Sequence, residues 1–227
     1  SPPFVQLLKK LDTIEGLKRL RFTSPHPQDM CNKVVDAIAD LESLMPYIHL
    51  PLQSGSDYIL KKMNRNYDSK KFMEIVHYIR SRMPNCAIST DIIVGFCGET
   101  EEHFQETYDL FKEVCFDLAF ISQYSTRKGT VAGLLKKDDV PAEVKKQRWH
   151  RLNDLLRETS LIKNKYFEGK TVQVLFERKS RKAGILKGRT EYGKEVILEG
   201  PETLIGQIVP VKIAESQEWR LLGELVT

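Results

Sequence analysis

The first 165 residues alternate between two hydrophobic periods. Apolar runs at 47–52, 87–94 and 118–124 have the length of strands, whereas the stretch 34–45 repeats apolar side chains every three or four positions, as one face of a helix does. The run 92–94 is continuously apolar, which is typical of a strand buried on both faces. Because strand and helix alternate, we expect a parallel sheet with right-handed crossovers.

The full pattern predicts four strands with helices between them. The strands are expected at 19–23, 47–52, 87–94 and 118–124, and helices at 4–11, 34–45, 68–83, 100–115 and 141–165, with a further helix opening near Ile59. Asp68 and Thr100 are placed to cap two of these helices, and Pro141 suits the first turn of the last one. A helix at 4–11 would follow a strand upstream of residue 1, so we expect the chain to begin inside a fold.

A change of pattern after Gly169 predicts a second domain. Short alternating segments are expected to form strands at 172–176, 186–190, 195–198, 208–213 and 219–226, with turn signals between them. Five short strands joined by close turns predict a small all-β barrel of the oligonucleotide-binding (OB) type. We place the boundary near Tyr166–Gly169, which gives an α/β domain over 1–166 and a barrel over 167–227.

Composition and charge narrow the class of protein only a little. The 227 residues are 41% hydrophobic and carry a net charge of +4, which suits one sizeable core with a small satellite domain. No run of about 18 apolar residues indicates a transmembrane helix, and no signal-peptide pattern opens the sequence, so no membrane partner is expected. The four cysteines lack metal-finger spacing, so we interpret them as reduced thiols, or as small buried side chains, in a cytoplasmic protein: Cys31, Cys86, Cys97 and Cys115.

Polar residues and glycines follow each predicted strand at its carboxyl end. The segments are TSPHP at 23–27, QSGS at 53–56, GFCGE at 95–99 and YSTRKGT at 124–130. Because parallel sheets bind ligands beyond the carboxyl ends of their strands, we expect these segments to line one binding mouth. Asp91 lies within the third strand, shortly before its end.

Structural interpretations stay open for several of these residues. Gly95 and Gly98 can serve only to permit a tight turn, and Glu99 can complement the dipole of the following helix. His26 and His49 can be oriented structural imidazoles. No catalytic triad and no phosphate-binding loop is present, so the residues alone predict a binding mouth without a named chemistry.

Basic residues are concentrated in the predicted barrel. The segment 177–194 holds seven basic and two acidic residues, a net charge of +5 over 18 positions. Its basic residues and one aromatic residue are Arg178, Lys179, Arg181, Lys182, Lys187, Arg189, Lys194 and Tyr192. This cluster indicates an RNA-binding face on which the aromatic ring could stack on a base; a solvated surface is the alternative, and it is also open for the basic helix 141–165.

Four strings in a fixed order resemble one family. They are FTSPHP at 22–27, HLPLQSGSD at 49–57, STDIIVGFCGET at 89–100 and YSTRKGT at 124–130. They resemble the radical S-adenosylmethionine (SAM) methylthiotransferases, above all the branch that adds a methylthio group to isopentenylated adenosine beside the tRNA anticodon. The tail, with GRT at 188–190 and GQIVPVKI at 206–213, resembles the TRAM domain, the RNA-binding barrel of that family.

This resemblance implies a fold, cofactors and sites. The fold is a partial parallel barrel of the triosephosphate isomerase (TIM) type followed by an OB-like barrel, with the tRNA anticodon stem-loop as partner. In the family, one [4Fe–4S] cluster cleaves S-adenosylmethionine to a radical and a second supplies sulfur. The residues implied in cofactor binding are Gln53, Ser54, Gly55, Ser56, Asp91, Gly95, Gly98 and Glu99. Those implied in substrate binding are Ser24, His26, His49, Tyr124, Ser125 and Arg127.

The sequence also departs from the family. The Cys-x-x-x-Cys-x-x-Cys loop of the radical cluster is absent, as are the family's three N-terminal cysteines and its first two barrel strands. We therefore expect this chain to lack cluster ligands and catalytic residues, to be inactive alone, and to need the N-terminal half of the parent enzyme as partner. Two other hypotheses are a non-catalytic RNA-binding protein and a sister enzyme acting on threonylcarbamoyladenosine or on a ribosomal-protein aspartate.

Overall fold

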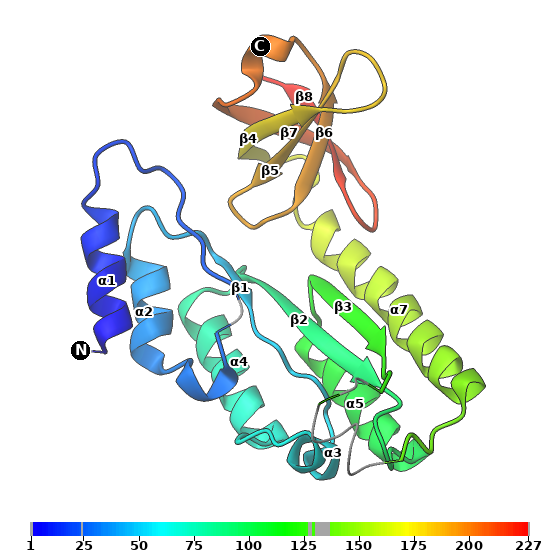
Figure 1. The fold of residues 1–227 in the computed structure, drawn as a ribbon. Helices are drawn as coiled ribbons and strands as arrows, with labels where there is room; N and C mark the ends of the chain where they lie inside the picture. Colours follow the sequence, from blue (N-terminus) through cyan, green and yellow to red (C-terminus); the bar gives the residue numbers. More distant parts are fainter. Residues whose placement is uncertain (1, 24, 127–128, 130–136, 227) are drawn as a thin grey trace.

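A parallel sheet forms the centre of the first domain. The computed structural model describes residues 2–23, 25–126, 129 and 137–226. Within these residues the sheet has the order β1-β2-β3, with β1 (Tyr47–His49), β2 (Ala87–Val94) and β3 (Leu118–Gln123) all parallel. The mixed α/β fold with a parallel sheet that the sequence predicts is confirmed (Figure 1).

Apart from α2, the helices begin and end close to the predicted positions. Those described are α1 (Pro3–Asp12), α2 (Asn32–Asp40), α3 (Asp57–Lys62), α4 (Ser69–Arg82), α5 (Glu101–Val114) and α7 (Ala142–Lys165), with a 3-10 turn η1 (Pro27–Asp29). Asp68 caps α4 because its carboxylate accepts a hydrogen bond from the backbone N of Lys71 at 2.7 Å. Thr100 caps α5 with a capping box shared with His103.

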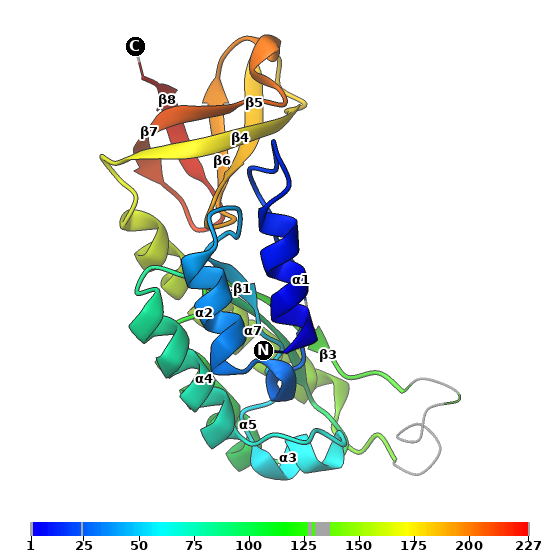
Figure 2. The ribbon, with the colours of Figure 1, turned by 90° about the vertical axis from the view of Figure 1, so that its left-hand side faces the viewer.

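The two faces of the sheet differ in what covers them. Ile88 and Ile92 of β2 pack in the main core with Phe104 and Phe111 of α5, and α4, α5 and α7 lie on that side (Figures 1 and 2). Since side chains alternate along a strand, Asp91 points to the opposite face. That face carries the polar residues from which the candidate site is built.

Three element predictions are wrong in extent. The segment 19–23 is not a strand; only Leu20 makes an isolated bridge, to Leu44. The segment that contains Leu44 leaves the helical path after Asp40 to make this pair, which explains why α2 ends before residue 45. The strand predicted at 47–52 ends at His49; beyond it the N of Leu52 donates to the side-chain Oγ1 of Thr90 at 2.9 Å instead of to a carbonyl oxygen of β2.

The second domain is a closed five-stranded barrel over residues 171–225. Its strands are β4 (Thr171–Lys179), β5 (Ile185–Thr190), β6 (Glu195–Glu199), β7 (Ile208–Ser216) and β8 (Leu221–Leu225), with a 3-10 turn η2 (Glu202–Leu204) between β6 and β7. The strand order is β4-β5-β6-β8-β7, and the interior is filled by a separate apolar cluster that includes Phe176 and Val211. The predicted OB-like barrel is confirmed.

The barrel lies at the amino-terminal ends of the sheet strands, beyond the end of α7 (Figure 1). The Asn164 side-chain amide donates hydrogen bonds to the carbonyl oxygens of Gln217 and Glu218, at 2.8 and 3.1 Å. These bonds attach the last turn of α7 to the turn between β7 and β8. The carboxyl ends of the strands lie at the far end of the sheet from the barrel.

Candidate functional site

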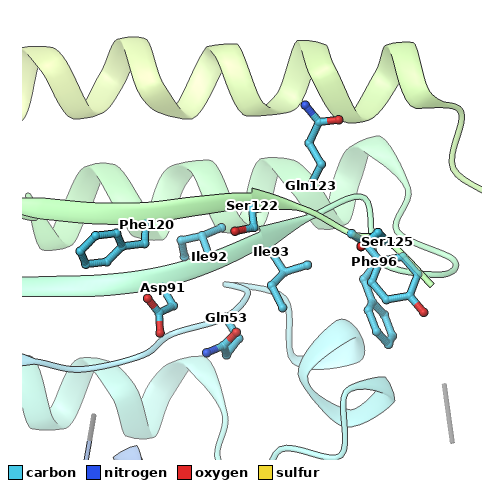
Figure 3. A pocket seen from close by; sticks show the side chains of 10 residues that line it. Gln53, Asp91, Ile92, Ile93, Phe96, Phe120, Ser122, Gln123 and Ser125 are labelled. Atoms are coloured by element: carbon cyan, nitrogen blue, oxygen red, sulfur yellow. The ribbon is translucent and has the colours of Figure 1, made fainter. Parts of the chain in front are cut away.

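A cavity of about 400 Å³ lies beside the carboxyl ends of β2 and β3. This volume falls in the range of small-molecule sites. The cavity is lined by Gln53, Asp91, Ile92, Ile93, Phe96, Phe120, Ser122, Gln123, Tyr124 and Ser125 (Figure 3). It therefore brings together Gln53, Asp91, Tyr124 and Ser125, which the sequence places in three separate strand-end segments.

The side chain of Gln53 lines this cavity, and the backbone of the same residue is strained. Its φ of 68° is in the left-handed region, which costs a non-glycine residue free energy. Two bonds hold it there: its N donates to the carbonyl of Asp91 at 2.8 Å, and its carbonyl accepts from the N of Ile93 at 2.9 Å. The backbone strain is retained at a position where the amide side chain lines the cavity, which is typical of a binding residue.

On the face of the sheet that carries Asp91, a chain of hydrogen bonds leads to the carboxylate of this residue. The Tyr47 hydroxyl lies 2.7 Å from the Ser89 Oγ, which lies 2.8 Å from the His49 Nδ1. The His49 Nε2 lies 3.3 Å from the Asp91 Oδ2. The His49 side chain is only 8% exposed and that of Asp91 is 37% exposed, so the last bond joins a buried imidazole to a carboxylate at the cavity.

Aromatic and aliphatic side chains form the walls. Phe120 is 56% exposed, and it is the register partner of Asp91 in the ladder between β2 and β3, so both residues face the same side. Phe96 packs edge-on against Tyr124, with ring centroids 4.8 Å apart. Sequence analysis missed Phe96, Phe120 and Ile93. Phe120 could have been identified from the alternation of side chains along β3, which puts Phe120 on the same face of the sheet as Asp91.

Glu99 lies outside the cavity lining, in a buried ion pair. Its Oε2 accepts hydrogen bonds from the Arg148 Nη1 at 2.8 Å and from the Gly95 backbone N at 2.6 Å. Burial raises the pKa of Glu99, and the bonds from Gly95 and Arg148 oppose that rise. In this structure the carboxylate holds the 95–99 turn to α7. The N of Gly98, in the same turn, donates to the Asp139 Oδ1 at 2.7 Å.

The segment 54–56 also serves the packing of the turn. Ser54 and Ser56 are fully buried. The N of Gly55 donates to the Thr107 Oγ1 at 2.9 Å, and a Cβ on Gly55 would lie only 2.6 Å from the Thr107 Cα, so a side chain is excluded by α5. These contacts fix the backbone immediately after Gln53 and thereby hold the Gln53 side chain in its position at the cavity.

The other predicted substrate residues have different positions. His26 caps η1 by accepting from the N of Gln28 at 3.3 Å, and its ring packs edge-on against Tyr67 at 5.3 Å. Ser24 and Arg127 lie outside the described residues. The site assignments for His26, Ser24 and Arg127 stay predictions.

Most of the basic residues on the barrel have acidic neighbours. Ion pairs join Arg178 to Glu195 (3.7 Å), Lys179 to Glu202 (3.3 Å), Lys187 to Glu195 (3.4 Å) and Arg189 to Glu177 (3.3 Å). Arg181 and Lys182 are exposed on the turn between β4 and β5, and no ion pair to another described residue involves them. We call residues 180–184 the cationic turn.

Lys194 and Tyr192 face the first domain, where they line a cavity together with Cys86 and Asp117. The Lys194 Nζ lies 2.6 Å from the Asp117 Oδ1, with the two side chains 10% and 7% exposed. The ring of Tyr192 packs on Phe167 at 5.4 Å, and burial raises its pKa to about 12. Two basic residues of α7 are also buried in ion pairs and unavailable to solvent: Lys145 with Asp138 and Arg148 with Glu99.

The described ranges contain neither a membrane-spanning helix nor a metal-binding cluster of side chains. Among their helices, none combines the length and apolar character that crossing a bilayer requires. Within the same ranges, no group of three or more His, Cys, Asp or Glu side chains is arranged to hold a metal ion.

Comparison with known proteins identifies two domains and a set of relatives. The radical SAM superfamily matches residues 1–111 and the TRAM domain matches residues 165–226. The tRNA-2-methylthio-N(6)-dimethylallyladenosine synthase of Clostridium botulinum (strain Hall) is 49% identical over 222 residues, covering 97% of this chain and 49% of the relative. The synthase of the same name from Bacillus subtilis (strain 168) is 47% identical over 220 residues, covering 96% and 42%. The chain thus spans about half the length of the curated relatives it matches.

A solved structure is also similar. It is coproporphyrinogen III oxidase from Escherichia coli, whose title calls it a radical SAM enzyme. The TM-score is 0.49 with 13% sequence identity, covering 73% of this chain and 45% of that chain.

Proposed function

This chain carries a radical SAM domain and a TRAM domain, and it is 47–49% identical over most of its length to tRNA-2-methylthio-N(6)-dimethylallyladenosine synthases; from this premise we propose that it is the SAM- and tRNA-binding portion of a methylthiotransferase. The modified base would be isopentenyladenosine next to the tRNA anticodon. Because tRNA is its substrate, we assign the chain to the cytoplasm. The resemblance predicted from the four ordered strings is confirmed at the level of domains and relatives.

The cavity suits S-adenosylmethionine in size and chemistry. It combines the carboxylate of Asp91 and the amide of Gln53 with the flat apolar walls of Phe96 and Phe120, a donor and acceptor set that fits a nucleoside carrying a charged tail. Bound S-adenosylmethionine would supply the radical chemistry. In that arrangement Gln53 and Asp91 would orient the ligand, and the buried segment 54–56 would keep Gln53 in place.

The thiols of this chain do not suit an iron–sulfur cluster. Cys86 and Cys97 are buried and Cys31 is exposed, and burial raises the pKa of Cys86 to about 12, which disfavours the thiolate that a cluster requires. We therefore propose that both [4Fe–4S] clusters are held by an N-terminal portion of the parent enzyme and that this chain alone does not complete the reaction.

The barrel is proposed to hold the RNA. We divide the chain into domains 1–166 and 167–227 and assign tRNA binding to the second. Exposed cationic side chains attract RNA by releasing counterions from its phosphates. The exposed cations of the cationic turn, Arg181 and Lys182, favour the anticodon stem-loop as partner, with Arg178 and Lys179 beside them.

One observation carries this proposal: a nucleoside-sized cavity with a strained polar residue lies in the same chain as a barrel with an exposed cationic turn. The test is to titrate the purified chain separately with S-adenosylmethionine and with an anticodon stem-loop RNA, using calorimetry. Binding of both is expected, and a Gln53→Ala variant should lose affinity only for S-adenosylmethionine. Binding of RNA alone would instead identify a non-catalytic RNA-binding protein.

A second experiment tests the cluster assignment. Anaerobic reconstitution with iron and sulfide is expected to leave the chain colourless, since no three thiols lie together in the described residues. A stoichiometric iron–sulfur absorption band would contradict the proposal that the cluster ligands lie in another part of the enzyme.

A further inference from the structure

The charge of the cavity comes from one residue. Of the described residues that line it, Asp91 is the one with a charged side chain, and none is Lys, Arg or His. The ammonium of Lys145, 5.3 Å from the ring centroid of the lining residue Tyr124, is held by both carboxylate oxygens of Asp138 at 2.6 Å and by the carbonyl of Tyr124. The described cavity is therefore negative, with apolar walls.

The hydrogen-bonded chain below Asp91 orients this carboxylate. Ser89 is fully buried between Tyr47 and His49. With the Nε2–H tautomer of His49, Tyr47 donates to Ser89, Ser89 donates to the His49 Nδ1, and the His49 Nε2 donates to Asp91. The last donor of this chain, the His49 Nε2, thus engages one oxygen of the Asp91 carboxylate. The other oxygen of Asp91 remains as an acceptor at the edge of the cavity, since the side chain is 37% exposed.

The surroundings of Asp91 define what that acceptor can meet. Figure 3 shows the Asp91 and Gln53 side chains on the same side of the strands, whereas Gln123 points toward the helix on the other side. Phe120, opposite Asp91 in the ladder, presents an exposed ring to the same space. A ligand lying against this ring would place its edge near Asp91, where an N–H donor is favoured and a carboxylate is repelled.

We propose that Asp91 is a specificity-determining residue, which accepts a hydrogen bond from an N–H group of the ligand and rejects a ligand with a carboxylate at that position, and that His49 is its positioning residue. This inference rests on the proposed function. The N–H group has two sources: the N6–H of isopentenyladenosine, or the ammonium group of S-adenosylmethionine. If the N–H group is the N6–H of isopentenyladenosine, Asp91 selects this neutral base over threonylcarbamoyladenosine, which carries a carboxylate.

The test uses matched ligands and variants of this chain. Calorimetric titrations would compare N6-isopentenyladenosine with N6-methyl-N6-isopentenyladenosine, which lacks the N–H, and with N6-threonylcarbamoyladenosine and S-adenosylmethionine. The variants are Asp91→Asn, His49→Phe and the control Asp109→Asn, an exposed residue of α5. Circular dichroism and thermal unfolding of each variant would establish that it is folded.

Asp91→Asn is expected to weaken binding of isopentenyladenosine about tenfold, the difference between a charge-assisted and a neutral hydrogen bond. Binding of the N-methylated analogue should not change, and the preference over the threonylcarbamoyl nucleoside should fall. His49→Phe should weaken binding of isopentenyladenosine by a smaller factor and leave binding of the N-methylated analogue unchanged. A general structural defect would weaken binding of both. Asp109→Asn should have no effect.

Each other outcome decides between the sources or overturns the proposal. A tenfold loss confined to S-adenosylmethionine would assign Asp91 to the cofactor ammonium. Equal losses for the N–H ligand and its methylated analogue, or no loss for any ligand, would overturn the proposal, as would wild-type protein that binds neither nucleoside nor cofactor. RNA binding by the barrel is measured separately, so failure at Asp91 with retained cofactor and RNA binding would leave the proposed function standing.

Discussion

The ammonium of Lys194 on the barrel lies 2.6 Å from the carboxylate of Asp117, the residue just before β3. Asp117 also accepts a hydrogen bond from the N of Ile88 at 2.9 Å, which joins it to β2. A second contact is made by Arg19, whose guanidinium donates to the carbonyl oxygens of Arg189 and Gln173 at 2.7 and 2.8 Å. The barrel is thus attached to the start of the sheet by two cations that sequence analysis could not distinguish from surface charges.

Lys194→Ala should destabilise the protein by about 1–2 kcal/mol, because the buried carboxylate of Asp117 loses its ion-pair partner at 2.6 Å and keeps Arg80, at 3.9 Å, as a weaker one. Lys182→Ala, which removes an exposed cation of the same barrel, should change the free energy of unfolding by less than about 0.5 kcal/mol. Urea denaturation of both variants measures the difference. Equal stabilities would mean that Lys194 behaves as a surface residue.

Reversing the charges of Arg181 and Lys182 to Glu should weaken binding of the anticodon stem-loop by at least about tenfold at low salt. The slope of log affinity against log salt should become shallower by roughly 0.7–0.9 for each phosphate contact that is lost. Lys9→Glu with Lys10→Glu, on α1, is the matched control. If both pairs reduce affinity equally, the effect is one of net charge and the cationic turn is not a specific RNA contact.

Replacing Gln53 by Gly should raise stability and lower ligand affinity together. Glycine adopts the φ of 68° without strain, so the free energy of unfolding is expected to rise by up to about 1 kcal/mol. Loss of the amide should reduce affinity for S-adenosylmethionine about fivefold. Asn64→Gly, at an exposed residue with φ of 58°, should leave binding unchanged. Thermal unfolding and calorimetry of the two variants test the contrast.

Glu99 should make the stability depend on pH in an unusual direction for a carboxylate. Because burial raises its pKa above the ordinary value of 4.5 in the folded state, the folded protein binds the proton more tightly than the unfolded chain does. Its contribution to stability is therefore complete below pH 4.5 and is lost as the pH rises through the raised pKa.

The variant Glu99→Gln lacks this titration. The difference in free energy of unfolding, wild type minus variant, should consequently fall as the pH increases from about 4 to 7. Glu113→Gln, on the exposed side of α5, should show no such change. Urea denaturation across this pH range measures the difference. A difference that rises with pH would mean that the pKa of Glu99 is lowered in the folded state and not raised.

Local signals in the sequence predicted much of the fold. The caps at Asp68 and Thr100 fixed where α4 and α5 begin, since a side-chain acceptor acts within one turn of a helix. The segment 19–23 failed as a strand because alternation reports which residues can be buried and not whether a neighbouring strand is available. Leu20 finds only one partner, at Leu44, before the prolines at 25 and 27.

The candidate site was predicted only in part because its partners are distant in sequence. The strand-end rule located Gln53 and Asp91, but the same rule could not show that Glu99 is paired with Arg148, 49 positions away. In the same way, a count of basic residues treated Lys194 and Arg181 alike, although one is buried against Asp117 and the other is exposed. Pairing of charges across domains is set by packing, and no local pattern reports it.

The attachment of the barrel at the start of the strands, with the cavity near their carboxyl ends, sets a length scale. The eight residues of β2 span about 26 Å, at roughly 3.3 Å each. A single nucleotide held on the barrel could not reach across that span into the cavity. An RNA that touches both must therefore span a comparable distance, so a single nucleoside bound in the cavity leaves the barrel unoccupied.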